Sequence, residues 1–200
     1  QELGFSSINQ LNDNLIIHAV RLAGRMGRST KWEVFLRSNR RSNGYEAETN
    51  RAMETENNQI RISLNYQASS QWRLGWKLVS THVYTEEKES GAGLVQDAVY
   101  TSKSEKWRIN FRWMQFNSEG FNSRLSFYEP DVLGALAFPF FQGFGHRAVV
   151  VLRYSVHRDL RIEGKWGHTQ YYGAKSVGSG NTLSEGPFRN ELRIQLSFSW

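Results

Sequence analysis

Residues 106–114 read KWRINFRWM, and this stretch decides the fold. Its odd-numbered positions form one apolar face: Trp107, Ile109, Phe111 and Trp113. The positions between them form one polar face: Arg108, Asn110 and Arg112. Successive side chains of a β-strand point to opposite sides, so alternation at a period of two predicts a strand with two unlike faces. Helical spacing does not fit this stretch.

The same two-faced pattern recurs along the chain. Its other clear copies lie at 59–67, 71–79, 160–166 and 190–200. Weaker strand candidates occupy about 14–23, 31–39, 93–102, 122–129, 133–140 and 145–157. These segments predict an all-β fold, an antiparallel transmembrane β-barrel of about 11–12 strands. No shift in composition divides the chain, so we expect a single domain over residues 1–200.

A soluble antiparallel sheet with one wet face gives the same alternation, and a soluble ligand-binding β-barrel is therefore an alternative. Two features of the faces favour a membrane barrel. Aromatic residues gather near strand ends, where Tyr66 and Trp72 flank one turn and Tyr100 and Trp107 flank another. An aromatic girdle of a membrane barrel lies at this level. The opposite face carries arginine and lysine with scattered glutamate, which suits a wet lumen.

The lengths of the connections favour a membrane barrel as well. Tight links at 67–71, 101–106 and 156–160 alternate with long polar ones at about 40–57, 85–92 and 173–188. Short periplasmic turns and long outside loops are typical of outer-membrane barrels. The sequence therefore predicts an integral protein of the bacterial outer membrane, with the lipid bilayer as its first partner. No apolar run reaches the length of roughly 18 residues that a membrane helix needs.

The last strand, NELRIQLSFSW, places Leu196, Phe198 and Trp200 on the outward register. An outward aromatic at this position resembles the carboxy-terminal signal by which such barrels are recognised for assembly. The barrel-assembly machinery is therefore an expected partner, and other envelope proteins are further candidates.

The direction of the strands bears on how the barrel begins. If residues 14–23 run in the same direction as the last strand, the strand number from there is odd, whereas single-chain bacterial barrels have an even number. Either residues 1–10 supply a short first strand, for which GFSSINQL is poor material, or strands precede this chain. We expect the second, so that the chain is the carboxy-terminal part of a larger barrel.

Two short patterns in the second half resemble a known group of proteins. The first is similar to R-[IL]-x-x-[YF]-E and the second to G-x-G-x-R; the matching residues are Arg124, Leu125, Phe127, Tyr128, Glu129, Gly143, Gly145 and Arg147. They resemble the carboxy-terminal part of large outer-membrane barrels of Bacteroidota, often described as helix-hairpin-helix domain-containing proteins. The resemblance covers about 117–190 best and extends back to about 58. It implies an architecture and a location, and it implies no activity.

Catalytic and metal-binding patterns are weak. The five histidines lack H-x-x-H and H-E-x-x-H spacing and the chain has no cysteine, so we expect neither a metal nor a cofactor. His82 and His168 lie near outside strand ends but on the lipid-side register. We therefore predict that the chain is not an enzyme; an outer-membrane β-barrel enzyme, with a serine or aspartate beside a histidine at the rim, is the alternative.

The net charge of +6 raises nucleic acid as a partner. Single-stranded binding needs basic and aromatic side chains on one face, whereas here they lie on opposite faces, so no nucleic-acid partner is expected. The glycine-rich stretches 143–146 and 177–180 do not open helices, which argues against a phosphate loop.

One set of charged residues is the candidate site. These residues would face the lumen, where they either form an ion-pair cluster that braces a loop or occludes the pore, or are merely solvated: Arg124, Glu129, Arg147, Arg153, Glu163 and Lys165. The predicted function is a pore or transport element, or a membrane-embedded subunit of an envelope complex. Inward charges would then decide whether the lumen conducts.

Overall fold

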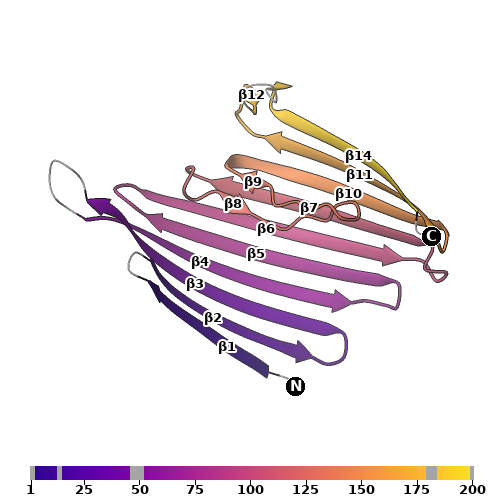
Figure 1. Ribbon diagram of the computed structural model, residues 1–200, viewed down its shortest axis with the longest axis horizontal. Helices are drawn as coiled ribbons and strands as arrows, with labels where there is room; N and C mark the ends of the chain where they lie inside the picture. The colour runs from indigo at the N-terminus through magenta and orange to yellow at the C-terminus, as the bar shows by residue number, and fades with distance from the viewer. Residues whose placement is uncertain (1–2, 13–14, 46–51, 179–183, 199–200) are drawn as a thin grey trace.

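The computed structural model describes residues 3–12, 15–45, 52–178 and 184–198. Ten of its strands form one antiparallel sheet in the order β1-β2-β3-β4-β5-β6-β7-β10-β11-β14 (Figure 1). Their bounds are β1 (Leu3–Asn12), β2 (Leu15–Met26), β3 (Thr30–Tyr45), β4 (Ala52–Gln67), β5 (Trp72–Tyr84), β6 (Lys88–Thr101), β7 (Trp107–Ser118), β10 (Gly143–His157), β11 (Leu160–Tyr171) and β14 (Phe188–Phe198). The predicted all-β, antiparallel fold is confirmed.

Four short strands form two small pairs outside this sheet. They are β8 (Leu125–Ser126) with β9 (Phe140–Phe141), and β12 (Ser176–Val177) with β13 (Ser184–Glu185). In the described parts of the chain, no helix has the length and apolar character that a membrane crossing requires.

Each face of the sheet follows the alternation of the sequence. The face that carries Lys77, Arg112, Arg147 and Lys165 is called the inner face below, and the opposite face is the outer face. Because neighbouring strands pair in register, each face continues from strand to strand, as with Trp76 opposite Gln96 and Gln96 opposite Trp113. Large apolar side chains on the outer face are exposed: Ile60, Ile62, Leu64, Trp72, Trp76, Leu78, Trp107, Ile109, Phe111, Ile162 and Trp166. An apolar surface this wide marks an interaction with a membrane or a partner.

The sheet is open within the described residues. Strands β1 and β14 form its two edges, and no pairing joins them. Residues 3–12 form the full-length edge strand β1, in which every residue pairs with β2, from Leu3 opposite Gly24 to Asn12 opposite Leu15. The judgement that this stretch is poor strand material is therefore wrong. Backbone pairing along β2 decides its conformation in spite of its low content of β-branched residues. With β1 the main sheet has ten strands in the described residues, an even number, so the odd number that favoured strands before this chain does not hold.

Two connections differ from the predicted lengths. Strands β3 and β4 extend through most of 40–57, with Arg40 opposite Glu56 and an ion pair of 3.5 Å from Arg40 Nε to Glu54. Polar cross-strand pairs stabilise a sheet that continues past its apolar part, so polarity alone did not mark a loop. The connection predicted to be long at about 85–92 is instead a tight turn of residues 85–87 between β5 and β6. The long connections join β7 to β10 and β11 to β14, and both leave and re-enter the sheet at the same end (Figure 1).

The strands predicted at 122–129 and 133–140 are not part of the main sheet. Strands β7 and β10 pair directly with each other, and residues 119–142 between them fold over the inner face (Figure 1). These residues are called the infolded segment below. Only β8, β9 and the bridge from Glu129 to Ala137 are β-structure there. Pro130 and Pro139 lack the N–H that a central strand needs, which explains why this stretch cannot extend the ladder.

Candidate functional site

The infolded segment rests on an apolar part of the inner face. Its Leu125, Phe127 and Phe141 pack into one buried cluster with four residues of the sheet: Val79, Val95, Met114 and Phe116. The ring centroids of Phe116 and Phe141 lie 4.9 Å apart. The inner face is therefore apolar near the long connections and charged further along the strands.

Glycines of β6 allow this close approach. A Cβ atom on Gly93 would lie 2.9 Å from Cδ1 of Leu125 and 3.0 Å from Cζ of Phe127, which is closer than such contacts normally come. The stretch SGAGL at 90–94 therefore lets the segment lie directly on the backbone of the sheet.

A buried charge cluster fixes the middle of the segment. The Arg147 guanidinium donates to Glu129 from Nε at 2.5 Å and from Nη2 at 2.7 Å, and Nη2 also donates to Glu191 at 2.9 Å. Its Nη1 donates to the Thr169 hydroxyl at 2.7 Å. The side chains of Arg147 and Glu129 are only 7% and 3% exposed. A bidentate arginine–carboxylate pair of this kind sets both distance and orientation.

Lys165 links this pair to a second carboxylate of the segment. Its Nζ lies 2.8 Å from Glu129, 2.9 Å from Asp131 and 3.2 Å from Glu191. Arg193 adds a hydrogen bond of 3.1 Å to Asp131. Three cations from β10, β11 and β14 thus face three carboxylates, so the cluster is balanced in charge. Buried ions remain stable only when paired and hydrogen-bonded in this way.

Further hydrogen bonds hold the backbone of the segment. Arg153 donates to the Asp131 carbonyl at 2.7 Å, and Gln195 donates to the Leu133 carbonyl at 3.0 Å. The Leu133 N–H donates to Glu163 at 2.5 Å. Near the start of the segment, the backbone N–H groups of Asn122 and Ser123 donate to Glu89 of β6 at 2.9 and 3.0 Å. Contacts along its whole length thus fix the segment to the sheet.

The candidate charged residues separate into three groups. Glu129, Arg147 and Lys165 meet in the buried cluster, and Arg153 pairs with Glu163 at 3.3 Å beside it. Arg124 lies apart, with its guanidinium 3.7 Å from the Phe121 ring centroid and a hydrogen bond to the Phe121 carbonyl at 2.8 Å.

Three members of the cluster were missing from the predicted set: Asp131, Glu191 and Arg193. Glu191 and Arg193 stand on the polar register of 190–200, and Arg193 pairs across the sheet with Lys165, so the alternation contained a signal for them. Asp131 lies in no alternating stretch. Its position follows only from the fold of the segment.

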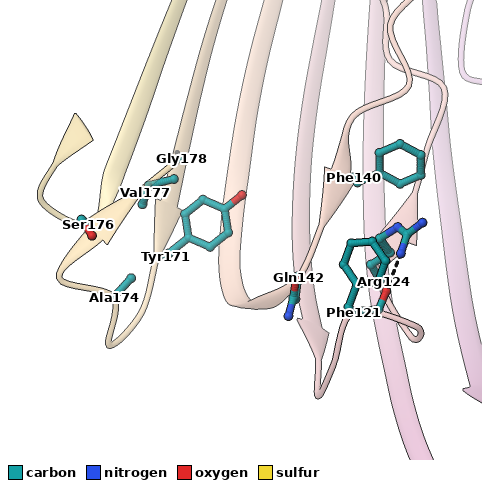
Figure 2. Close-up of a pocket in the computed structure, with 9 residues that line it drawn as sticks. All are labelled: Phe121, Arg124, Phe140, Gln142, Tyr171, Ala174, Ser176, Val177 and Gly178. Atoms are coloured by element: carbon teal, nitrogen blue, oxygen red, sulfur yellow. Dashed lines mark hydrogen bonds between the residues drawn. The ribbon is translucent and has the colours of Figure 1, made fainter. Parts of the chain in front are cut away.

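Two hollows adjoin the infolded segment. The first is a pocket of about 460 Å³ near the long connections, where Phe121, Arg124 and Phe140 lie on one side and Tyr171 and Val177 on the other (Figure 2). The second is a cavity of about 220 Å³ on the inner face. Its lining includes Tyr128 and Pro130 of the segment and a group of basic residues on the sheet: Arg73, Arg108, Arg112 and Arg153.

The predicted girdle residues lie on the outer face, at the end of the sheet that carries the turns 68–71 and 102–106. Trp72 and Tyr100 are cross-strand neighbours with ring centroids 4.9 Å apart, and Trp107 stacks on Tyr154 at 4.1 Å. Tyr66 is exposed on the same face. Their role as a lipid girdle stays a prediction.

The predicted assembly signal lies only partly within the described residues. Leu196 and Phe198 are exposed on the outer face of β14, whereas Trp200 lies outside the described residues. The signal and its recognition by assembly machinery stay predictions. Within the described ranges, no group of three or more histidine, aspartate or glutamate side chains is placed to hold a metal ion.

Comparison with known proteins identifies the fold. No protein-family model matches the chain, and no curated protein matches it. Among solved structures it is similar to OmpT (in-vitro folded), an outer membrane protein of Vibrio cholerae, with a TM-score of 0.57 and 11% sequence identity. The match covers 97% of this chain and 63% of that one, so this chain spans about 63% of the length of its structural neighbour.

This likeness confirms a fold of the outer-membrane β-barrel kind, and it supports the predicted location in the bacterial outer membrane and the association with its lipid bilayer. It also corrects the prediction that the chain is not an enzyme. At 11% identity the shared fold does not establish enzyme status in either direction, so the exclusion of an activity does not stand.

Proposed function

We propose that the chain is a pore or transport element of the outer membrane and that its infolded segment narrows the lumen. The observation that carries this proposal is the position of residues 119–142, which a buried charge cluster fixes against the inner face. The outer face meanwhile exposes apolar side chains. In a membrane barrel the apolar face meets lipid and the polar face surrounds water, so the segment would stand in the path of solutes.

The charge cluster would keep the segment in one place. Moving it away from the sheet would separate Glu129 and Asp131 from their cations. Breaking buried pairs of this kind is strongly unfavourable. The segment would therefore act as a permanent part of the channel wall.

Completion of the barrel belongs to the same proposal. The edge strands expose large outward side chains, including Leu3 (74%) and Phe5 (67%) on β1 and Leu192 (71%) and Ile194 (74%) on β14. Unpaired backbone groups are not tolerated in the hydrocarbon core, so both edges would have to be paired there. In this proposal further strands pair with β1 and β14. The greater length of the structural neighbour is consistent with a larger barrel.

A relationship to the Bacteroidota barrels is a second part of the proposal. Its support is that Glu129 of the first pattern and Arg147 of the second form the central ion pair of the site. Gly143, with φ of +81°, and Gly145, against which Phe116 packs closely, stand where the second pattern places glycine. The two patterns would therefore describe one structural feature, the attachment of the infolded segment.

Conductance in planar bilayers tests the pore. We expect the full-length protein to give discrete channels, and a variant in which a short Gly-Asn-Gly turn replaces residues 119–142 to give a larger single-channel conductance. A control variant, Lys103→Ser, changes the tight turn at the other end of the sheet and should leave the conductance unchanged. If neither the unmodified protein nor the shortened variant conducts after confirmed insertion, the pore is contradicted. A membrane-embedded subunit of an envelope complex would then be favoured.

A further inference from the structure

The smaller cavity on the inner face has an unusual charge. It lies beside Tyr128 and Pro130 of the infolded segment, and arginines from three strands reach it: Arg73 of β5, Arg108 of β7 and Arg153 of β10. Arg108 and Arg153 are direct cross-strand neighbours. Like charges directly opposite each other in a sheet are destabilising. A nearby anion would offset this repulsion.

Fixed carboxylates of the protein do not balance the cavity. Asp97 is the only acidic residue in its lining, and Arg112 already binds it through Nε at 2.6 Å and Nη2 at 2.8 Å. Arg153 pairs with Glu163 at 3.3 Å. Arg73 and Arg108 have no carboxylate within ion-pair distance among the described residues. The adjacent buried cluster, with three cations and three carboxylates, shows the opposite arrangement.

The lining also indicates the kind of anion. Guanidinium groups present forked N–H donors that match the oxygen atoms of carboxylates and phosphates. Asn65 and Asn110 of the lining add amide groups, and Tyr128 and Pro130 supply apolar contacts. A volume of about 220 Å³ admits a small solute and excludes a polymer chain. Both unpaired arginines are exposed at the cavity, so a solute in the lumen can reach them.

We propose that Arg73, Arg108 and Arg153 form a binding site for small oxyanions, solutes that carry a phosphate or carboxylate group, beneath the infolded segment. The site rests on the proposed function, because it would lie in the path of solutes through the lumen. It makes the channel selective for anions: an anion entering the lumen replaces part of its hydration shell with guanidinium N–H donors. Binding at one such site must remain weak enough for the anion to leave.

Inorganic phosphate serves as the probe in two measurements on the full-length protein. In planar bilayers, phosphate should block the chloride current at a defined concentration. The double variant Arg73→Gln/Arg108→Gln should raise the half-blocking concentration about tenfold or more, because charge-assisted hydrogen bonds to the anion are lost. Arg37→Gln, an exposed inner-face arginine on β3 that is not part of the cavity, is the matched control and should change it less than about twofold.

Equilibrium dialysis of phosphate against the detergent-solubilised protein separates the site from the pore. Saturable binding that the double variant loses and Arg37→Gln retains supports the site even if no channel appears, and absence of a channel then contradicts only the proposed function. Channels without saturable phosphate binding would overturn the site and leave the pore intact. Equal weakening by the double variant and by Arg37→Gln would also overturn it, because general lumen charge would then explain the effect.

Discussion

Glu129 joins the infolded segment to two cations of the sheet. It accepts two hydrogen bonds from Arg147 and lies 2.8 Å from Lys165, while its own side chain is 3% exposed. The sequence pointed to Glu129 and Arg147 through two patterns that resemble those of known barrels. It did not reveal Asp131, because a carboxylate in an irregular segment has no register to place it.

Removal of Arg147 should therefore destabilise the protein strongly. Arg147→Ala leaves Glu129 and Glu191 with reduced compensation in a buried site, and we expect a loss of about 3–5 kcal/mol in the free energy of unfolding. Urea unfolding of the protein in lipid vesicles measures this change through the shift of the midpoint.

Arg40→Ala is the control for that measurement. Arg40 pairs with Glu54 and Glu56 at 3.5 and 3.8 Å, and these side chains are largely exposed. Surface pairs contribute about 0–1 kcal/mol, so the control should unfold nearly as the unmodified protein does. Equal effects of the two substitutions would show that the buried cluster does not hold the segment.

At the scale of elements, the strands of the main sheet were predictable and the infolded segment was not. Alternation in 59–67, 71–79 and 106–114 places the residues of β4, β5 and β7 on their observed faces. Residues 122–129 carry a similar local pattern, yet they dock on the inner face. The difference lies in long-range contacts, with the glycines of β6 and the charges of β10, β11 and β14, which a local period does not encode.

The apolar part of the inner face is a second feature whose role a local pattern does not predict. Met114 and Phe116 stand on the register that Arg108 and Arg112 occupy, so the polar face becomes apolar toward one end of β7. This change in the pattern is visible in the sequence. The sequence does not show, however, that the infolded segment packs on these apolar residues.

Substitution of Gly93 should release one part of the segment without disrupting the sheet. In Gly93→Val, the new side chain would occupy the space that Leu125 and Phe127 fill, so the segment must move away from β6. We expect trypsin to cut the folded protein after Arg124 much faster than in the unmodified protein.

Gly164→Ala gives the comparison for this test. A Cβ at position 164 would have as its nearest contact the Arg193 carbonyl oxygen, at 3.9 Å, which is ordinary packing distance. Trypsin should therefore cut this variant at the rate of the unmodified protein. A cleavage rate that stays the same in Gly93→Val would argue against the close contact between the segment and β6.

At the scale of the whole molecule, the main feature is a sheet with two unlike faces. The sequence predicted their division, since the outer face collects the apolar and aromatic alternation and the inner face most of the charge. Part of a larger barrel, as expected from the sequence, would leave two unpaired edges, and in the described residues β1 and β14 are such edges. The further strands that we propose would complete the barrel there.

The most direct test of the membrane orientation uses the absence of cysteine from residues 1–200. With any cysteine elsewhere in the full-length protein replaced by serine, an introduced cysteine is unique. Spin labels would be placed one at a time along β4, from Ile60 to Asn65, in the full-length protein in vesicles. Oxygen, which partitions into lipid, and a water-soluble nickel complex would report the surroundings of each label. We predict that Ile60, Ile62 and Leu64 favour oxygen and that Arg61 and Asn65 favour the nickel complex, with a period of two. Equal access of the nickel complex to both sets would contradict a membrane-spanning sheet.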